Sequence, residues 1–415
     1  MTPARPTPDI DHEPILAGLR IVEYPAYIAA PLGGLVLAQL GAEVIRVDPP
    51  GGNIDHGRWP LTAQGDSLYW ASLNRGKRSV ELDLRSHQSR RVLCEMLRNS
   101  GDDGRIFVTN LAVDGELSYE SLSAGVPGLI MVRLSGNHDG SPALDYTVNA
   151  GLGFPLVTGE PGSGPVNHVL PAWDIAAGLF IALAILAAER RRRTTGTGQL
   201  ITVALSDVAM SIASDLGFLA EAQCIDRARQ ADGNYLYGAY GDSFATADGR
   251  HAMVVAISNR QWRELIQGVG LEAALTTAAD ALGYSLDDEG GRFEARELIS
   301  AFLRPWFARR SINEIRKALS GRSVLWSPYR SFKQMLAEDP RCSIANPMFA
   351  VVDNPKWGSW MTAGSPLAFS NAQRQSAGVA PTLGMDTQSV LDDLAPSTPS
   401  PGMTAAQPGH VKGLS

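Results

Sequence analysis

Apolar and polar positions follow one another along the first half of the chain with a period that switches between that of strands and that of helices. Short apolar runs are separated by longer segments with helical spacing. A strand, a crossover helix and a second strand within about 30 residues form a βαβ unit, so we expect a parallel sheet. The pattern predicts strands over 19–24, 43–48, 79–84, 105–109, 129–135 and 200–204, and helices over 32–41, 87–99, 175–193 and 207–223.

The pattern changes near residues 225–233. From 234 to about 322, a turn between two strands at 244–251 precedes mostly helical segments, which predicts a smaller inserted domain. Loose polar connections near Pro340 indicate a return to the large domain. We therefore expect an α/β chain with a flexible tail at 1–14, a large domain at 15–225, a small domain at 226–335, a return at 336–393 and a flexible tail at 394–415.

Length and composition agree with two globular domains. The 415 residues exceed what one hydrophobic core ordinarily supports. A hydrophobic share of 44% with 19% charged residues is typical of globular proteins. A net charge of −7 argues against nucleic acid as the main ligand. Cys94, Cys224 and Cys342 are too scattered for a disulfide framework or a metal site, which predicts a reducing compartment.

Neither end of the chain resembles a targeting segment. Residues 1–13 are proline-rich and acidic, unlike a signal peptide. The longest apolar run, 175–188, is shorter than the roughly 20 residues that a membrane span needs, so it is interpreted as a buried core helix. We expect a cytoplasmic protein that binds neither membrane nor nucleic acid.

Asp174 is the main candidate for chemistry. It stands in Pro171-Ala-Trp-Asp-Ile-Ala-Ala-Gly178, directly before the long apolar helix. Asp is a favoured N-cap, so one interpretation is a structural cap worth about 1 kcal/mol. The same place suits a nucleophile, because the positive end of the helix dipole favours an ionised carboxylate, which can carry an acyl group covalently. Position alone leaves both interpretations open.

Other polar residues have equally ordinary interpretations. The segment Asn74-Arg-Gly-Lys-Arg78 puts three cations in five residues and is compatible with a solvated turn or with a phosphate clamp. His138 and His168 lack the spacing of metal ligands. His168 precedes Asp174 by six residues and either lines the same cavity or makes a structural hydrogen bond, which the pattern favours.

Several motifs occur in an order that resembles one enzyme family. They are Ala30-Pro-Leu-Gly-Gly34, Gly41-Ala-Glu-Val-Ile-Arg-Val-Asp-Pro-Pro-Gly51, Leu73-Asn-Arg-Gly-Lys-Arg-Ser-Val-Glu-Leu-Asp83, and Asp174-Ile-Ala-Ala-Gly178 followed by Thr195-Gly-Thr-Gly-Gln199. From about residue 17 to 392 the chain resembles the class III coenzyme A (CoA) transferases, also called the CaiB/BaiF family. The resemblance implies a Rossmann-like large domain with a parallel sheet built from both chain ends, an inserted α+β domain, and a homodimer of interlocked subunits. It also implies an acyl-CoA substrate, no permanently bound cofactor and no metal.

The resemblance also implies roles for individual residues. Asp174 matches the aspartate that carries the acyl group. CoA-binding positions are matched by Tyr27, Ile28 and Ala29 at the thiol end, Asn110 in the second CoA loop, Tyr146 near the pantetheine, and Arg46, Asn74, Lys77 and Arg78 around the basic turn. The second loop departs from the common Asn-Phe-Arg-Pro-Gly, since it reads Asn110-Leu-Ala-Val-Asp-Gly115, so the adenine-side contact is not predicted.

Three longer stretches resemble one branch of the family. Residues 166–174, 233–241 and 326–330 are similar to members that move CoA from one carboxyl group of mesaconate to the other within one molecule, in a carbon-fixation cycle. Candidate walls for the acyl group are His168, Tyr235, Tyr237 and Arg330. Three alternatives remain: CoA transfer between separate acids, acyl-CoA racemisation, and CoA binding without turnover. Racemisation is disfavoured because Leu144 replaces the histidine base of racemases.

Overall fold

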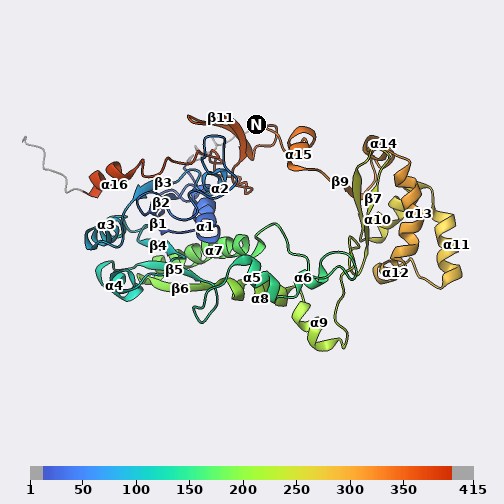
Figure 1. Ribbon diagram of the computed structural model, residues 1–415, viewed down its shortest axis with the longest axis horizontal. Helices are drawn as coiled ribbons and strands as arrows, with labels where there is room; N and C mark the ends of the chain where they lie inside the picture. The colour runs from blue at the N-terminus through green and yellow to red at the C-terminus, as the bar shows by residue number, and fades with distance from the viewer. Residues whose placement is uncertain (1–12, 395–415) are drawn as a thin grey trace, which may run out of the picture.

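A six-stranded parallel sheet forms the centre of the larger of two lobes (Figure 1). The computed structural model describes residues 13–394, so nearly all of the two predicted tails lies outside it. The strand order β3-β2-β1-β4-β5-β6 is that of a doubly wound Rossmann-like sheet. The strands are β1 Arg20–Tyr24, β2 Glu43–Asp48, β3 Arg78–Glu81, β4 Ile106–Thr109, β5 Ile130–Ser135 and β6 Gln199–Ala204.

Helices cover both faces of this sheet. Successive strand residues point to opposite faces, so Ile21 packs into one core cluster and Val22 into the other. One face is covered by α1 (Ala29–Ala38), α7 (Ala172–Thr195) and α8 (Leu205–Asp215), and the other by α3 (His87–Arg98), α4 (Tyr119–Gly125) and α16 (Thr387–Leu394). The predicted α/β class with a parallel sheet is confirmed.

Shorter elements connect the layers. They are α2 Leu68–Leu73, η1 Gly115–Leu117, α5 Asp145–Gly151, α6 Phe154–Val157 and α9 Phe218–Cys224. The single helix predicted over 207–223 is wrong, because α8 ends at Asp215 and α9 begins at Phe218. Gly217 between them has φ +82°, a left-handed conformation that glycine adopts without steric cost and that ends a helix.

The C-terminal segment covers an edge of the sheet and adds no strand to it. All six strands lie within residues 20–204, so a sheet built from both chain ends is a wrong expectation. The Asp386 amide donates to the Ser79 carbonyl at 2.9 Å, and the Ser79 amide donates to the Asp386 carboxylate at 2.8 Å. The returning chain, which also forms the hairpin β10 (Phe349–Asn354) and β11 (Gly358–Ala363), thereby protects the exposed edge of β3.

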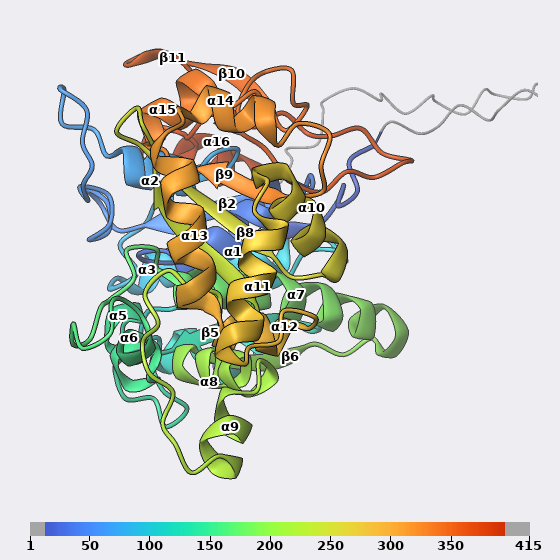
Figure 2. The same ribbon diagram turned by 90° about the vertical axis from the view of Figure 1, so that its right-hand side faces the viewer.

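The smaller lobe has its own hydrophobic core. A three-stranded antiparallel sheet, β7-β8-β9, packs against helices that lie on its side away from the large lobe (Figures 1 and 2). The buried core residues come from 240–324, and the β7–β8 hairpin confirms the turn predicted at 244–251. The domain boundaries stay a prediction. The elements are β7 Tyr240–Ala245, β8 His251–Ala256, α10 Asn259–Val269, α11 Glu272–Leu282, α12 Glu289–Glu294, α13 Arg296–Ala308, α14 Ile312–Ala318 and β9 Leu325–Pro328.

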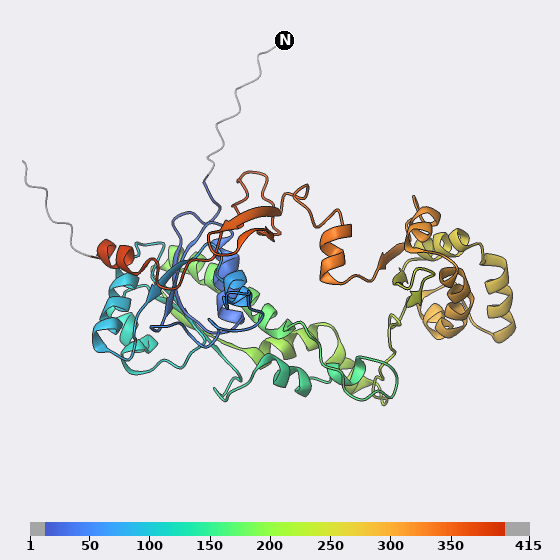
Figure 3. The same ribbon diagram turned by 45° about the horizontal axis from the view of Figure 1, so that its top comes forward.

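Two separate connections join the lobes (Figure 3). One runs from α9 to β7, and the other runs from β9 through α15 (Phe332–Glu338) to the hairpin β10–β11. Both carry exposed large apolar side chains, including Ile225, Phe332 and Ile344.

Helix α7 is long and apolar enough to span a membrane by length and composition. One face of it, including Ala177, Ile181 and Ile185, is fully buried in the core of the large lobe. Leu179 and Leu183 lie exposed on another face. The buried face and its contacts with α1 and α8 are those of a core helix.

Candidate functional site

A cavity of about 480 Å³ lies at the carboxyl ends of β1, β4 and β5. Loops that follow these strands supply Tyr27, Asn110 and Gly136 to its wall. In a sheet of this order the strand order reverses between β1 and β4. Doubly wound proteins bind their ligands at this switch point. Its other walls include Ile28, Arg58, Trp59, Tyr69, Leu144, Asp145, Tyr146, Val169, Pro171 and Asp174.

Asp174 reaches the cavity from the first turn of α7. It is the third residue of this helix, whose N-cap position is Pro171, so the interpretation of Asp174 as the cap is wrong. The cap comes from a distant residue: the buried Asp145 carboxylate accepts hydrogen bonds from the amides of Trp173 at 2.7 Å and Asp174 at 3.1 Å. Because Asp145 satisfies these orphan amides, the Asp174 carboxylate is left for chemistry.

His168 holds Asp145 in place. Its Nε2 donates to the second oxygen of Asp145 at 2.9 Å. The structural hydrogen bond favoured from the sequence is therefore found, and His168 is not among the cavity walls. Tyr146, whose hydroxyl donates to the Val169 carbonyl at 3.3 Å, does line the cavity beside them.

Burial raises the pKa of Asp174 to about 6, and the nearby negative charge of Asp145 acts in the same direction. The positive charge of Arg58 lowers it. Loss of solvent therefore outweighs the favourable interactions of the carboxylate, including that with the positive end of the helix dipole. At neutral pH the carboxylate is still mostly ionised, and the weak solvation of its charge makes it a better nucleophile than a solvated carboxylate.

Helices α1 and α7 approach each other closely next to Asp174. A Cβ on Gly33 would lie 2.8 Å from the Ile181 side chain, and one on Gly178 would lie 2.9 Å from the Ala29 carbonyl. Gly178 is one turn after Asp174 and therefore lies on the same face of α7. The two glycines bring the carboxylate beside the N-terminus of α1, which begins at Ala29.

The loop before α1 is fixed by Asn110. Its side-chain amide accepts from the Ala26 amide at 2.8 Å and donates to the Ala26 carbonyl at 2.7 Å. Tyr27 is held at φ +62°, a conformation that costs free energy for a residue with a side chain. The structure thus brings Tyr27, Ile28, Asn110, Tyr146 and Asp174 to one cavity, whereas Ala29 is buried at the start of α1.

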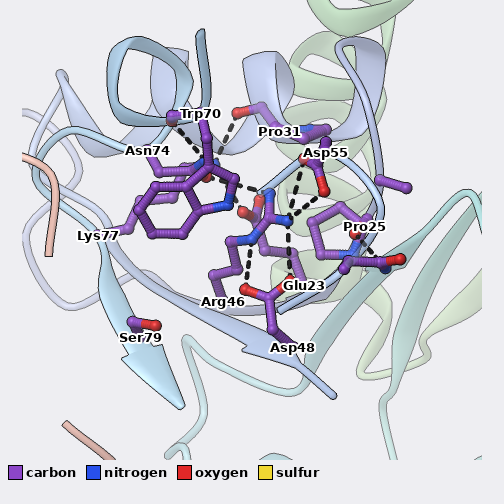
Figure 4. Close-up of polar contacts among 12 residues, drawn as sticks. Glu23, Pro25, Pro31, Arg46, Asp48, Asp55, Trp70, Asn74, Lys77 and Ser79 are labelled. Carbon is purple, nitrogen blue, oxygen red and sulfur yellow. Dashed lines mark hydrogen bonds and ion pairs between the residues drawn. The ribbon is translucent and has the colours of Figure 1, made fainter. Parts of the chain in front are cut away.

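Three of the four residues predicted around the basic turn, Arg46, Asn74 and Lys77, are buried and contact one another or their neighbours through polar groups (Figure 4). Arg46 is fully buried and forms a two-pronged ion pair with Asp48 at 2.7 and 2.9 Å, together with a pair to Asp55 at 3.1 Å. The Lys77 ammonium donates to Glu23 at 2.6 Å and to Asn74 at 3.0 Å. We call Glu23, Arg46, Asp48, Asp55, Asn74 and Lys77 the polar network.

The polar network does not support a phosphate clamp. Burial lowers the pKa of Lys77 to about 8, and all the network side chains are at least 95% buried. A phosphate contact needs an accessible cation, and these cations are already matched by carboxylates. Arg78 is partly exposed but pairs with Glu43 at 2.8 Å and donates to Ser389 of α16, so it joins the sheet edge to the returning chain.

Three predicted substrate residues are not brought to the cavity within one chain. Tyr235 and Tyr237 precede β7 and stack against the guanidinium groups of Arg296 and Arg229. Arg330 is paired with Asp339 at 2.9 Å. The charge of Arg330 is therefore already compensated by the protein, and its assignment to a free carboxylate is not supported.

Two cavity residues were missed from the sequence. Arg58 and Tyr69 lie in and after a long irregular loop between β2 and α2, where no periodicity or motif marks them. Their proximity to Asp174 follows from the fold of that loop. Among residues 13–394 there is no cluster of three or more His, Cys, Asp or Glu side chains able to hold a metal.

The comparison with protein families gives one match over most of the chain. The model of the family described as CoA-transferase family III matches residues 16–387. Among solved structures, a CaiB/BaiF family protein from Brucella suis has a TM-score of 0.77 and 24% identity, covering 92% of this chain and 100% of that one. A Mycobacterium tuberculosis protein has a TM-score of 0.72 and 22% identity, covering 91% and 99%. These two structures agree with the fold.

Curated relatives are similar over nearly the whole length. A protein named 2-methylfumaryl-CoA isomerase from Chloroflexus aurantiacus is 48% identical over 96% of each chain. A protein named succinyl-CoA:mesaconate CoA-transferase from Haloarcula marismortui is 27% identical, covering 92% of this chain and 97% of that one. The resemblance to the family noted from the motifs is confirmed.

Proposed function

The chain belongs to CoA-transferase family III, and from that premise we propose that it isomerises 2-methylfumaryl-CoA (mesaconyl-C1-CoA) to 3-methylfumaryl-CoA (mesaconyl-C4-CoA). CoA moves from one carboxyl group of the acid to the other through an acyl intermediate on Asp174. The observation that carries the proposal is the 48% identity to a relative of that name over 96% of both chains. The cavity around Asp174 supports it chemically.

In the first half of the reaction Asp174 attacks the C1 thioester carbonyl. The C–S bond breaks, CoA leaves as a thiolate, and a mixed anhydride joins Asp174 to C1 of the acid. The thiolate then attacks the aspartyl carbonyl of this anhydride. Free mesaconate is released into the cavity, and Asp174 becomes a CoA thioester.

In the second half the acid reacts through its other end. The C4 carboxylate attacks the aspartyl thioester, which releases the thiolate and forms a mixed anhydride at C4. The thiolate attacks the C4 carbonyl and restores the Asp174 carboxylate. No atom is gained or lost, and the acid must turn end for end without leaving the cavity.

Each attack develops negative charge on a carbonyl oxygen beside α1 and α7. The first turn of an α-helix leaves backbone N–H groups without intrahelical partners, so helix N-termini stabilise such oxyanions. The amides of Ile28 and Ala29 at the start of α1 are placed for this role by the close approach of α1 to α7. The thiol end of CoA binds against Tyr27 and Tyr146 in this proposal.

We also propose a homodimer, interlocked as in the family. The exposed apolar residues on both connections between the lobes, among them Phe332 at 84% exposure, need a covering surface. In this proposal a second, interlocked subunit supplies that surface. A cytoplasmic location is proposed because Cys94, Cys224 and Cys342 are all free thiols.

The direct test is to incubate the pure protein with mesaconyl-C1-CoA alone and to separate the two isomers by chromatography. Formation of the C4 isomer is expected, and the Asp174→Asn variant serves as the matched control. Absence of the C4 isomer with active wild-type protein contradicts the proposal. Hydroxylamine trapping of acylated Asp174, detected by mass spectrometry, tests the intermediate.

The second candidate is CoA transfer between separate acids, which the 27% identical mesaconate CoA-transferase favours. Adding isotopically labelled free mesaconate separates the two functions. Intramolecular transfer leaves the product unlabelled, whereas intermolecular transfer labels it. A racemase is disfavoured because Leu144, exposed at the cavity, offers no base for the second face of an α-carbon.

A further inference from the structure

Arg58 is a cation in the wall of the Asp174 cavity without a protein carboxylate of its own. Within residues 13–394 its guanidinium makes no hydrogen bond or ion pair to another side chain, whereas Arg46 and Arg330 are both paired with aspartates. Most other cavity walls are apolar or aromatic, such as Leu111, Leu134 and Val169. An anion bound in this cavity therefore has Arg58 as its cationic partner.

Two aromatic rings hold the Arg58 guanidinium in a defined place. Its central carbon lies 5.6 Å from the ring centre of Tyr27 and 5.3 Å from that of Tyr69, and both rings are cavity walls. Cation–π contacts use the faces of the guanidinium and the rings, so the N–H groups stay available for a planar carboxylate. The contact with Tyr69 also places a second hydrogen-bond donor, the Tyr69 hydroxyl, near Arg58.

The Tyr69 hydroxyl is a buried polar group without a hydrogen-bond partner in the part of the chain that the structure describes. Burial raises the pKa of Tyr69 well above its usual value. The hydroxyl is therefore protonated at neutral pH and able to donate. Buried polar groups in native proteins are nearly always satisfied, so an unsatisfied donor in a cavity indicates a ligand atom.

The polar network fixes the loop that carries Arg58. Asp55 is held by the fully buried Arg46, and the Arg58 amide donates to the Asp55 carbonyl at 3.2 Å. The Ser67 hydroxyl donates to the Arg58 carbonyl, and Ser67 also caps α2, the helix that bears Tyr69. Backbone on both sides of the site is thus tied to buried structure, which pre-organises the two donors.

We infer that Arg58, with the Tyr69 hydroxyl, binds the free carboxylate of a dicarboxylic acyl group while the other end of that group reacts with Asp174. This inference rests on the proposed function and names a residue that determines its specificity. Substrate and product each carry one free carboxylate, and they differ by an end-for-end turn of the acid. One carboxylate site therefore serves both directions of the reaction.

The experiment measures single-turnover release of CoA, as acylation of Asp174, from two thioesters. One is mesaconyl-C1-CoA, and the other is 2-methylcrotonyl-CoA, which has a methyl group where the first has the free carboxylate. Wild-type protein is expected to prefer the dicarboxylic thioester. In Arg58→Gln the acylation rate should fall about 10²-fold or more with mesaconyl-C1-CoA and less than about 3-fold with 2-methylcrotonyl-CoA. Only mesaconyl-C1-CoA has a free carboxylate that loses its charged partner.

Three further variants sharpen the test. Arg58→Lys should recover part of the rate with mesaconyl-C1-CoA, because charge returns without the two-pronged geometry. Tyr69→Phe keeps the aromatic ring but removes the hydroxyl. Its acylation rate should be about 10-fold lower than that of wild type, again only with the dicarboxylic thioester. Arg91→Gln, at an exposed site on α3, should match wild type.

The assignment of Arg58 is overturned if Arg58→Gln lowers the acylation rate equally with both thioesters, or lowers it with neither. If Arg58→Gln does not fold, the assignment is overturned by two results together. Wild type would acylate equally fast with both thioesters, and Tyr69→Phe would have the same acylation rates as wild type. Failure of the proposed function is seen separately. In that case wild type is acylated by mesaconyl-C1-CoA but forms no C4 isomer, while the comparison of the two thioesters still decides the role of Arg58.

Discussion

The polar network and the Asp174 cavity both combine arginine, carboxylates and aromatic rings, yet they are arranged for different ends. In the network, Arg46 has two carboxylate partners and no exposure, and Trp70 covers it at 5.5 Å. In the cavity, Arg58 and Asp174 form no ion pair within the described chain, although the positive charge of Arg58 lowers the pKa of Asp174. Matched buried charge fixes backbone, whereas unmatched charge at a cavity is left for a substrate.

The largest effect is expected from removing the unmatched carboxylate. Asp174→Asn should lower isomerisation at least about 10⁴-fold, because the other carboxylate of the cavity wall, Asp145, is engaged by His168 and by the amides of Trp173 and Asp174. Binding of CoA, measured by calorimetry, should change by less than about 3-fold. Near-normal isomerisation in this variant would show that the acyl group does not pass through Asp174.

Breaking the matched charges should instead damage stability. Arg46→Met leaves Asp48 and Asp55 buried without their cation, so the free energy of unfolding should fall by about 3–5 kcal/mol. Arg20→Met, in the partly exposed pair with Glu43, should cost less than about 1 kcal/mol. Denaturant unfolding followed by circular dichroism measures both. Similar costs for the two variants would contradict the role given to burial.

This contrast also marks how far the sequence alone can be interpreted. Strand and helix periodicity predicts all six sheet strands, and the place of Asp174 before an apolar run predicts a polar residue at a helix start that is either a cap or a nucleophile. The partner of a charge is not encoded locally. Lys77 looks like a phosphate ligand in a basic turn, but its partner Glu23 lies 54 residues earlier. For the same reason the spacing leaves Asp174 open as the cap, although the cap is Asp145, 29 residues away.

Arg58 illustrates a second limit. Its loop has no regular period, and its position depends on a buried pair between Arg46 and Asp55 and on the bond from Ser67. Neither contact follows from spacing or propensity. Conversely, the residue type of Arg330 predicts a partner for a free carboxylate, and the fold pairs this arginine with Asp339. The type of a residue indicates which chemistry it can perform. Tertiary contacts decide which of several residues of that type remains unpaired and available to a ligand.

Asp145 tests whether the residue that caps α7 also sets the chemistry. Asp145→Asn keeps an oxygen for the amides of Trp173 and Asp174 but removes the negative charge. We expect kcat about 10-fold lower, because the hydrogen bond from His168 is weakened and Asp174 is less well oriented. The acid limb of kcat/KM against pH should move to lower pH, because the like charge that raises the pKa of Asp174 is gone. An unmoved limb with a lower kcat would indicate a purely structural role.

The pH profile of wild type follows from the same charges. The Asp174 nucleophile must be ionised, so kcat/KM should fall as pH decreases through about 6, the pKa of the carboxyl group. Arg58 lowers that pKa, so Arg58→Gln should move the limb to higher pH, opposite to Asp145→Asn. Steady-state rates between pH 4.5 and 8.5 measure both shifts. Limbs that move in the same direction in the two variants would refute this account of the charges.

The smallest effect is on stability. The pKa of Asp174 is about 6 in the folded protein and near its ordinary value of 3.8 when unfolded, so the folded state binds more protons between these values. The stabilising contribution of the protonated form is complete below about pH 4 and is lost as pH rises through 6. The Asp174→Asn side chain cannot ionise. The free energy of unfolding of this variant, relative to that of wild type, should therefore be higher at pH 7.5 than at pH 4 by on the order of 1 kcal/mol, after allowance for solvent screening.

Thermal unfolding at these two pH values measures the gain, which corresponds to a rise in Tm of about 1–2 °C in a protein of this size. Asp287→Asn, at an exposed position of the small lobe, provides the matched control and should show no such difference. A gain of the same size at both pH values would mean that the substitution acts through packing and not through charge. A gain only at neutral pH would mean that the fold keeps the Asp174 carboxylate ionised at a cost in stability.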